Sequence, residues 1–227
     1  TNIEQVAIGI ANTCVIDSTH QLFCWGENAS GEVGNNTTTD VLTPTKIMDA
    51  VADVSIGQIH ACAATIDGHL HCWGANSFGN LGLGNGSVDD VLTPTQVGTW
   101  TDYEKVACGV VHTCARRSNG VACWGGNFAG QLGLSDTIDR DTPAILNLSA
   151  VDSLYSGGAH TGAVIDGDVF MMAQEWEPTD VATKTTAQTA DTATVEATFK
   201  IGAETRTVTY SLKKLRDGWE IDDIASP

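Results

Sequence analysis

Basic residues are scarce in this chain of 227 residues, which has 11 Lys and Arg against 28 Asp and Glu and a formal net charge of −17. A surface this acidic repels phosphate, which argues against nucleic acids and anionic membranes as partners. Long apolar runs are missing too, since no stretch approaches the roughly 18 residues of a membrane helix. No signal peptide is visible and the chain begins without Met, so we expect a mature form or an excised fragment.

Catalytic signatures are also absent from the sequence. It contains no GxSxG nucleophile elbow, no HExxH zinc motif and no GxxxxGK(S/T) phosphate loop. Acidic clusters lack the spacing of a calcium loop, so we expect solvated loops there, with weak calcium binding as the alternative. The clusters are Asp89 and Asp90; Asp136, Asp139 and Asp141; and Asp222 and Asp223. We therefore predict no metal, no cofactor and no catalytic residue.

An internal repeat dominates the sequence. The tripeptide Cys-Trp-Gly recurs at 24–26, 72–74 and 123–125, each time opening the pattern Trp-Gly-x-Asn-x-x-Gly-x-x-Gly, with a Thr-Pro pair downstream. Upstream, a glycine recurs about every 50 residues and is followed three positions later by His or Asn. The repeated positions are Gly9, Gly57, Gly109 and Gly157; Asn12, His60, His112 and His160; Trp25, Trp73 and Trp124; and Asn28, Asn76 and Asn127.

The local pattern of each repeat is that of a β-sheet. In the second repeat, two short apolar segments flank Asp67-Gly68, which is typical of a hairpin turn. A strand, a hairpin, a glycine-rich loop and a further strand make one propeller blade. We therefore predict a mainly β fold, a partial β-propeller of three complete blades plus part of a fourth, followed by a C-terminal antiparallel β-meander.

The combined pattern GxxHxC…CWGxNxxGxLG…TP resembles the repeat of the regulator of chromosome condensation family over residues 3–165. The resemblance implies a seven-bladed propeller that binds proteins through its faces and loops. Some members of that family promote nucleotide exchange on a small GTPase, and a related bacterial propeller inhibits β-lactamase. Three repeats and part of a fourth do not close such a ring, so we expect an open arc, a fragment, or a ring completed by another chain.

Six of the 7 cysteines form pairs that flank the three hairpins. The pairs are Cys14–Cys24, Cys62–Cys72 and Cys114–Cys123. This spacing places the two residues opposite each other on adjacent strands, a separation that suits a disulfide. The fourth repeat has Gly162 and Met171 at the matching positions, and joint loss is expected of a bonded pair. Three disulfides predict an extracellular, periplasmic or cell-surface location; buried thiols in a reducing cell are the alternative.

The seventh cysteine, Cys108, stands where the first two repeats have Ile8 and Ile56. We expect a buried apolar substitute, with a reactive or intermolecular thiol as the alternative.

A zinc site is a rival explanation for the second cysteine pair, because His60, Cys62, His69, His71 and Cys72 lie close together in sequence. The first and third repeats keep the cysteine pair but lack counterparts of His69 and His71, so the conservation of the pair among the repeats does not depend on those histidines. The repeated histidines are interpreted as buried imidazoles bonded to loop backbone, and the repeated tryptophans as residues that pack one blade on another.

The chain changes character after the fourth partial repeat. We predict propeller repeats over 1–166 (about 1–50, 51–102, 103–150 and a partial 151–166) and a separate segment over 167–227. Alternating residues at 193–200, 205–213 and 218–224 predict a three-stranded meander. Residues 169–227, through FMMAQEW, VEATF and YSLKKLRDGWEIDDI, more weakly resemble the C-terminal half of a nuclear-transport-factor-like (cystatin-like) α+β roll. A degenerate closing blade or cap is the alternative.

The leading functional hypothesis is a secreted or periplasmic, non-catalytic module that binds an unidentified protein partner through its blade loops and faces. In a second hypothesis, the C-terminal roll forms a small-molecule or hydrolase/lyase-type pocket with Glu175, Asp222 or Asp223 as acid or base. In a third, the chain self-associates so that several arcs complete a ring.

Overall fold

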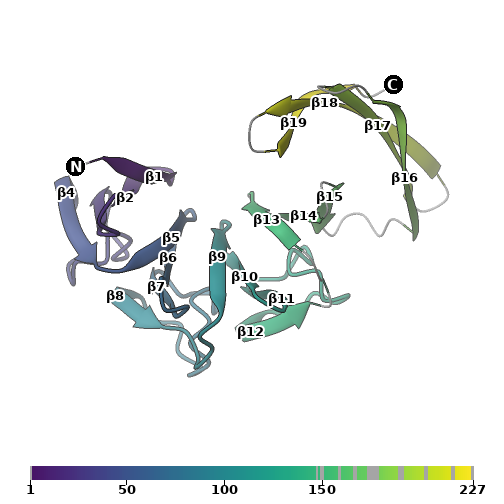
Figure 1. The fold of residues 1–227 in the computed structure, drawn as a ribbon. Helices are drawn as coiled ribbons and strands as arrows, with labels where there is room; N and C mark the ends of the chain where they lie inside the picture. The colour runs from purple at the N-terminus through teal and green to yellow at the C-terminus, as the bar shows by residue number, and fades with distance from the viewer. Residues whose placement is uncertain are drawn as a thin grey trace. The chain divides into compact units, whose positions relative to one another are not determined.

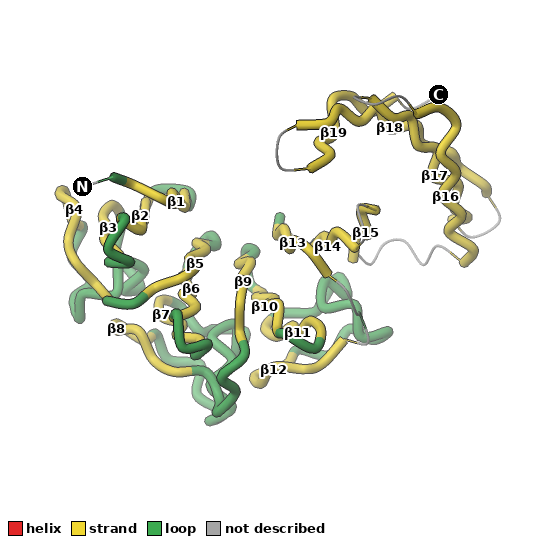
Figure 2. Tube along the Cα trace, viewed as in Figure 1, coloured by secondary structure: helices red, strands yellow, loops and turns green. Residues whose placement is uncertain are grey.

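The computed structural model describes residues 2–146, 148, 151–157, 160–165, 168–172, 179–188, 192–201, 204–215 and 218–225. Every regular element in these ranges is a β-strand (Figures 1 and 2). No helix long and apolar enough to span a membrane occurs among them. The chain divides into two compact units, Thr1–Gln174 and Glu175–Pro227.

The first unit contains three four-stranded antiparallel sheets and one of three strands. The first blade is β1 (Ile3–Ile8), β2 (Asn12–Asp17), β3 (Leu22–Gly26) and β4 (Val41–Met48). The second is β5 (Val51–Ile56), β6 (His60–Thr65), β7 (Leu70–Gly74) and β8 (Val91–Gln96). The third is β9 (Tyr103–Cys108), β10 (His112–Arg117), β11 (Gly120–Gly125) and β12 (Arg140–Leu146). The partial fourth is β13 (Val151–Ser156), β14 (Thr161–Ile165) and β15 (Asp168–Met172).

Within each blade the strands pair in chain order, so the first and last strands are the two edges of the sheet. The innermost strands β1, β5, β9 and β13 follow one another along the inside of the unit (Figure 1). This arrangement confirms the predicted partial propeller of three complete blades and part of a fourth. The Thr-Pro pairs of the repeat lie inside the edge strands β4, β8 and β12. Proline is tolerated there because an edge strand does not need every N–H for a neighbour.

The hydrophobic core lies between the blades. One cluster joins the first and second blades and contains Val33, Val54 and Trp73; the next joins the second and third and contains Leu81 and Trp124. Both indoles are fully buried. Removing about 200 Å² of indole surface from water contributes on the order of 5 kcal/mol, so the repeated tryptophan is a main source of blade-to-blade stability.

Two glycines of the motif are required by close packing. Gly74 follows Trp73 with a φ of 101°, and a Cβ there would lie 2.7 Å from the carbonyl oxygen of Ile59. Gly82 has a φ of 70°, and its Cβ would lie 2.5 Å from Nε1 of Trp124 in the next blade. Positive φ and lack of space both exclude a side chain at these positions.

The second unit is a four-stranded antiparallel meander of β16 (Thr179–Gln188), β17 (Thr192–Ile201), β18 (Glu204–Leu215) and β19 (Gly218–Ala225). The predicted meander is confirmed, but it has one strand more than predicted. The missed strand, β16, is rich in Thr and Ala and lacks a clear apolar alternation, which is why the sequence pattern did not reveal it. An α+β roll also needs helices, and the described part of this unit contains none.

Candidate protein-binding surface

Two kinds of connection share one face of the first unit. The turns that join the first and second strands of each blade lie beside the long glycine loops, 27–40, 75–90 and 126–139, that join the third and fourth strands. Backbone hydrogen bonds link turn to loop in each blade: Glu27 N to Ala11 O at 2.9 Å, Ala75 N to Ile59 O at 2.8 Å, and Gly126 N to Val111 O at 2.8 Å. We call this the glycine-loop face. The hairpin turns at 18–21, 66–69 and 118–119 lie on the opposite face.

The repeated glycine of each inner turn closes that turn. The N–H groups of Gly57 and Gly109 donate to the carbonyl oxygens of His60 and His112 at 2.8 Å, and Gly9 and Gly157 repeat the pattern. A Cβ on Gly57 would lie 2.2 Å from the carbonyl oxygen of Gly109. Successive turns therefore meet too closely for a side chain.

The repeated asparagine holds each glycine loop in shape from inside. In the third blade, the Oδ1 of Asn127 accepts from the N–H of Leu132 at 3.0 Å, and its Nδ2 donates to the carbonyl oxygens of Asp136 and Ile138. Asn28 and Asn76 bond across their own loops in the same way. All three are buried, so each loop is built around an amide that joins its two limbs.

Two of the acidic side chains expected to be merely solvated also brace these loops. The Oδ1 of Asp139 accepts from the backbone N–H of Asn127 at 2.6 Å. Asp136 accepts from the N–H of Ile138 and pairs with Arg140 at 2.6 Å. The backbone hydrogen bond and the guanidinium lower the pKa of Asp136. Asp139 is exposed and Asp136 is partly buried, so both carboxylates lie in solvated loops as expected, and both also have hydrogen-bond donors within their own loop.

Large apolar side chains project from the loops that are held this way. Phe128 is 63% exposed and Ile138 is 64% exposed, both in the glycine loop of the third blade. Phe78 and Val88 are exposed in the corresponding loop of the second blade. These exposed residues were not among those predicted from the sequence. A signal was available, since they are apolar residues at positions of the glycine loop that the repeat leaves variable.

The inner turns border a shallow hollow of about 300 Å³ at the centre of this face. Ile10, which is 72% exposed, lines it together with Gln58 and Val110. The glycine-loop face therefore combines a hollow with exposed apolar side chains around it.

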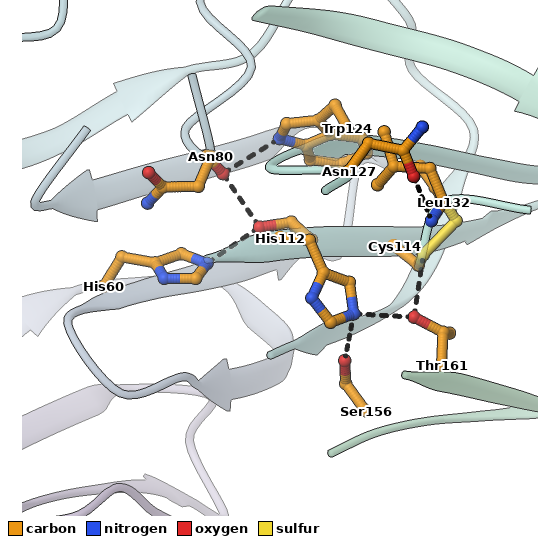
Figure 3. Close-up of a disulfide and its surroundings, with 11 residues drawn as sticks. His60, Asn80, His112, Cys114, Trp124, Asn127, Leu132, Ser156 and Thr161 are labelled. Carbon is orange, nitrogen blue, oxygen red and sulfur yellow. Dashed lines mark hydrogen bonds between the residues drawn. A yellow bond between two sulfur atoms is a disulfide. The ribbon is translucent and has the colours of Figure 1, made fainter. Parts of the chain in front are cut away.

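The repeated histidines lie between blades and are not bonded to loop backbone as predicted (Figure 3). The Nε2 of His60 lies 2.8 Å from the hydroxyl oxygen of Thr113 in the next blade. That hydroxyl donates to the carbonyl oxygen of Asn80 at 2.8 Å, so its one proton is used and His60 is the donor. The Nε2 of His112 lies 2.7 Å from the hydroxyl oxygen of Thr161. Each of these two histidines therefore pairs with a threonine one blade further on, and the Nε2 of His112 also lies 3.0 Å from the hydroxyl oxygen of Ser156.

The protonation state of these histidines follows from their burial. Desolvation lowers the pKa of His60 to about 3 and that of His112 to about 4. Both imidazoles are therefore neutral near pH 7, as a buried hydrogen-bonding residue requires. The matching His160 is exposed.

The repeated tryptophans join one blade to the glycine loop of the preceding blade. The Nε1–H of Trp124 donates to the carbonyl oxygen of Asn80 at 3.0 Å (Figure 3), and that of Trp73 donates to the backbone carbonyl oxygen of Glu32 at 2.8 Å. Trp25, in the first blade, is only partly buried.

Three disulfides join the cysteine pairs predicted from the repeat, each with a Cα–Cα distance of 4.1 Å. Cys108 is a buried free thiol, and desolvation raises its pKa to about 12, so the thiol stays protonated near neutral pH. Ligand atoms of His60, Cys62 and Cys108 lie within 4.8 Å of one another, but Cys62 is committed to its disulfide. His69, a member of the rival zinc set, instead contacts Asp67 at 3.2 Å.

The residues of the enzymatic hypothesis are not brought together by any described contact. Glu175 lies outside the described residues, and Asp222 and Asp223 lie on β19. That hypothesis remains a prediction.

The repeats are similar in sequence to those of known proteins. Two family models, both described as the regulator of chromosome condensation (RCC1) repeat, match residues 19–64 and 67–116, and residues 3–32, 51–80 and 103–131. The chain is 34% identical over 175 residues to the ultraviolet-B receptor UVR8 of Arabidopsis thaliana, covering 73% of this chain and 40% of the receptor. It is 40% identical over 104 residues to the X-linked retinitis pigmentosa GTPase regulator of Mus musculus, covering 42% of this chain and 10% of that protein.

Solved structures show the same fold. Yeast RCC1 (Prp20), crystallised with Kap60, matches with a TM-score of 0.66 and 21% identity over 76% of this chain and 44% of that one. Human WBSCR16 matches with a TM-score of 0.66 and 20% identity over 92% of this chain and 61% of that one. The chain thus spans less than two thirds of the length of each of these relatives.

Proposed function

The chain belongs to the regulator of chromosome condensation (RCC1) repeat family, and from that premise we propose that it is a non-catalytic protein-binding module that acts through its glycine-loop face. The observation that carries the proposal is the pair of exposed side chains, Phe128 and Ile138, on a loop that the buried amide of Asn127 holds in shape. Yeast Prp20, a structural neighbour, was crystallised with Kap60 and studied for binding to Gsp1p and histones. Protein partners are therefore a property of related propellers.

Preorganisation of the loop favours binding. An exposed apolar side chain on a rigid loop loses little conformational freedom on binding, so more of its burial energy is available for affinity. Aromatic residues at the centre of an interface commonly carry most of the binding energy. The net charge of −17 favours a partner with a basic surface, because opposite charges accelerate association.

The test compares wild type with a Phe128→Asp/Ile138→Asp double variant as bait for proteins of the source organism's extracellular material. Ile66→Asp is the matched control, because Ile66 is 57% exposed but lies at a hairpin turn on the opposite face. We expect wild type and the control to retain the same partner at micromolar concentration and the double variant to lose it at least tenfold. Equal retention by all three proteins would contradict the proposal.

We further propose an oxidising compartment, secreted, periplasmic or at the cell surface, on the strength of the three disulfides. Thiol titration of the denatured, unreduced protein from its natural source tests this. One thiol, that of Cys108, is expected; seven thiols would contradict it.

A further inference from the structure

The free thiol of Cys108 lies beside one of the three disulfides. Cys108 ends β9, the first strand of the third blade, and packs in one cluster with Cys62 and Cys72 of the second blade. The Sγ atoms of Cys108 and Cys62 lie within 4.8 Å of each other, and a ring nitrogen of His60 lies within the same distance of both. None of these four residues is more than 5% exposed. A thiol and a disulfide are therefore enclosed together between two complete blades.

The matching position in the other blades carries no thiol. In the second blade it is Ile56, which packs in one cluster with the disulfide of the first blade. In the fourth blade it is Ser156. The cysteine at position 108 is thus a local difference between the repeats, and it places a sulfur nucleophile where the other blades have an apolar side chain or a hydroxyl.

The surroundings of the thiol control how fast it can react. Desolvation raises the pKa of Cys108 to about 12, hydrogen bonding with Ser55 acts in the opposite direction, and the charge of Asp53 raises the pKa further. His60 is neutral near pH 7 and contributes no charge. Only a thiolate attacks a disulfide, so a reaction of Cys108 is slow at neutral pH and accelerates as the pH rises.

We propose that Cys108 is an internal nucleophile for the Cys62–Cys72 disulfide, so that the oxidised chain has two disulfide forms. In the exchange, the Sγ thiolate of Cys108 bonds to the Sγ of Cys62, the bond between Cys62 and Cys72 breaks, and its electron pair leaves with the Sγ of Cys72. Cys108 loses one proton and Cys72 takes up one. The step therefore consumes no oxidant and no reductant.

The two forms differ in what the disulfide joins. The bond between Cys62 and Cys72 links two strands of one hairpin, whereas a bond between Cys62 and Cys108 links the second blade to the third. The second bond closes a longer loop of chain, which restricts the unfolded state more strongly. Both forms contain one free thiol, and neither alters the glycine-loop face, so the exchange goes beyond the proposed function and does not depend on it.

Disulfide mapping of the full oxidised chain by mass spectrometry tests the exchange. Wild type is incubated at pH 9, then denatured and alkylated with N-ethylmaleimide at pH 5, where thiolates are scarce, and digested. We expect a peptide pair linked through Cys62 and Cys108 with the alkyl group on Cys72, and an initial rate that rises about tenfold per pH unit between pH 7 and pH 10. The control within the same molecule is the Cys14–Cys24 disulfide, which has Ile56 as its neighbour and should stay intact.

Cys108→Ser removes the nucleophile and introduces the residue that the fourth repeat carries at this position. We expect this variant to keep the Cys62–Cys72 bond and to give no alkylated peptide. Wild type that still carries the alkyl group on Cys108 alone after a week at pH 9 would overturn the proposal. Exchange that also scrambles Cys14–Cys24 would overturn it too, because the reaction would then proceed through the unfolded chain and not through the native contact.

Discussion

Replacing Thr113 with Val removes a hydroxyl from the junction between the second and third blades while keeping the side-chain volume nearly constant. In the native junction this hydroxyl accepts from His60 at 2.8 Å and donates to the carbonyl oxygen of Asn80 at 2.8 Å. Asn80 keeps its second donor, the Nε1–H of Trp124 at 3.0 Å. The main consequence is therefore a fully buried Nε2–H of His60 without an acceptor. An unsatisfied buried donor costs about 1–3 kcal/mol, so we expect a loss of about 2 kcal/mol of stability.

The second substitution of the cycle is His60→Leu, which removes the Nε2–H donor that Thr113→Val leaves without an acceptor. Replacing both polar partners by apolar side chains of similar shape is often nearly neutral. The double variant His60→Leu/Thr113→Val should therefore be more stable than the sum of the two single changes predicts, by about 1–2 kcal/mol. Thr101→Val, at an exposed site, is the control and should change stability by less than about 0.5 kcal/mol.

Urea unfolding followed by tryptophan fluorescence, with the disulfides kept oxidised, measures all four proteins. A coupling energy below about 0.3 kcal/mol, within the error of additivity, would refute the assignment of His60 as the donor to Thr113.

Three other predictions follow from the same structure. The lowered pKa values of His60 and His112 mean that the unfolded chain takes up protons as the pH falls below about 6.5, so each residue should cost wild type about 2 kcal/mol of stability between pH 8 and pH 5. Urea unfolding at the two pH values should show that His60→Leu loses about 2 kcal/mol less than wild type. Asn127→Ala strands the buried N–H of Leu132 and should cost about 2–3 kcal/mol, with faster proteolysis in the 126–139 loop than in the 75–90 loop. Trp124→Phe removes a fully buried indole N–H and should lower the thermal midpoint more than Trp25→Phe, whose indole is partly exposed; equal shifts by calorimetry would contradict the packing described.

The repeat was sufficient to predict the blades, because each blade is a local unit and its motif residues act mostly within it. The cysteine pairs flank a single hairpin, and Asn127 bonds within a single loop. Such contacts depend on spacing along one repeat, which can be read directly.

Contacts between repeats were harder to predict. The partner of His60 is 53 residues away, in another blade, so no spacing within one repeat reveals it. Comparison of successive repeats does carry a signal. Where one repeat has His60 or His112, the next has a threonine, Thr113 or Thr161, directly after its own repeated histidine. Where the first repeat has Asn12, the next has Ala61 at the threonine position. The exposed side chains of Phe128 and Ile138 were missed because these residues do not recur from repeat to repeat, so the repeat pattern does not single them out.

The most direct test of the central claim, that the glycine-loop face binds a protein, is hydrogen–deuterium exchange of the module with its captured partner. The account predicts protection of the loops at 27–40, 75–90 and 126–139 and little change at the hairpin turns 18–21, 66–69 and 118–119. Protection confined to those hairpin turns, with the glycine loops exchanging as in the free protein, would contradict it.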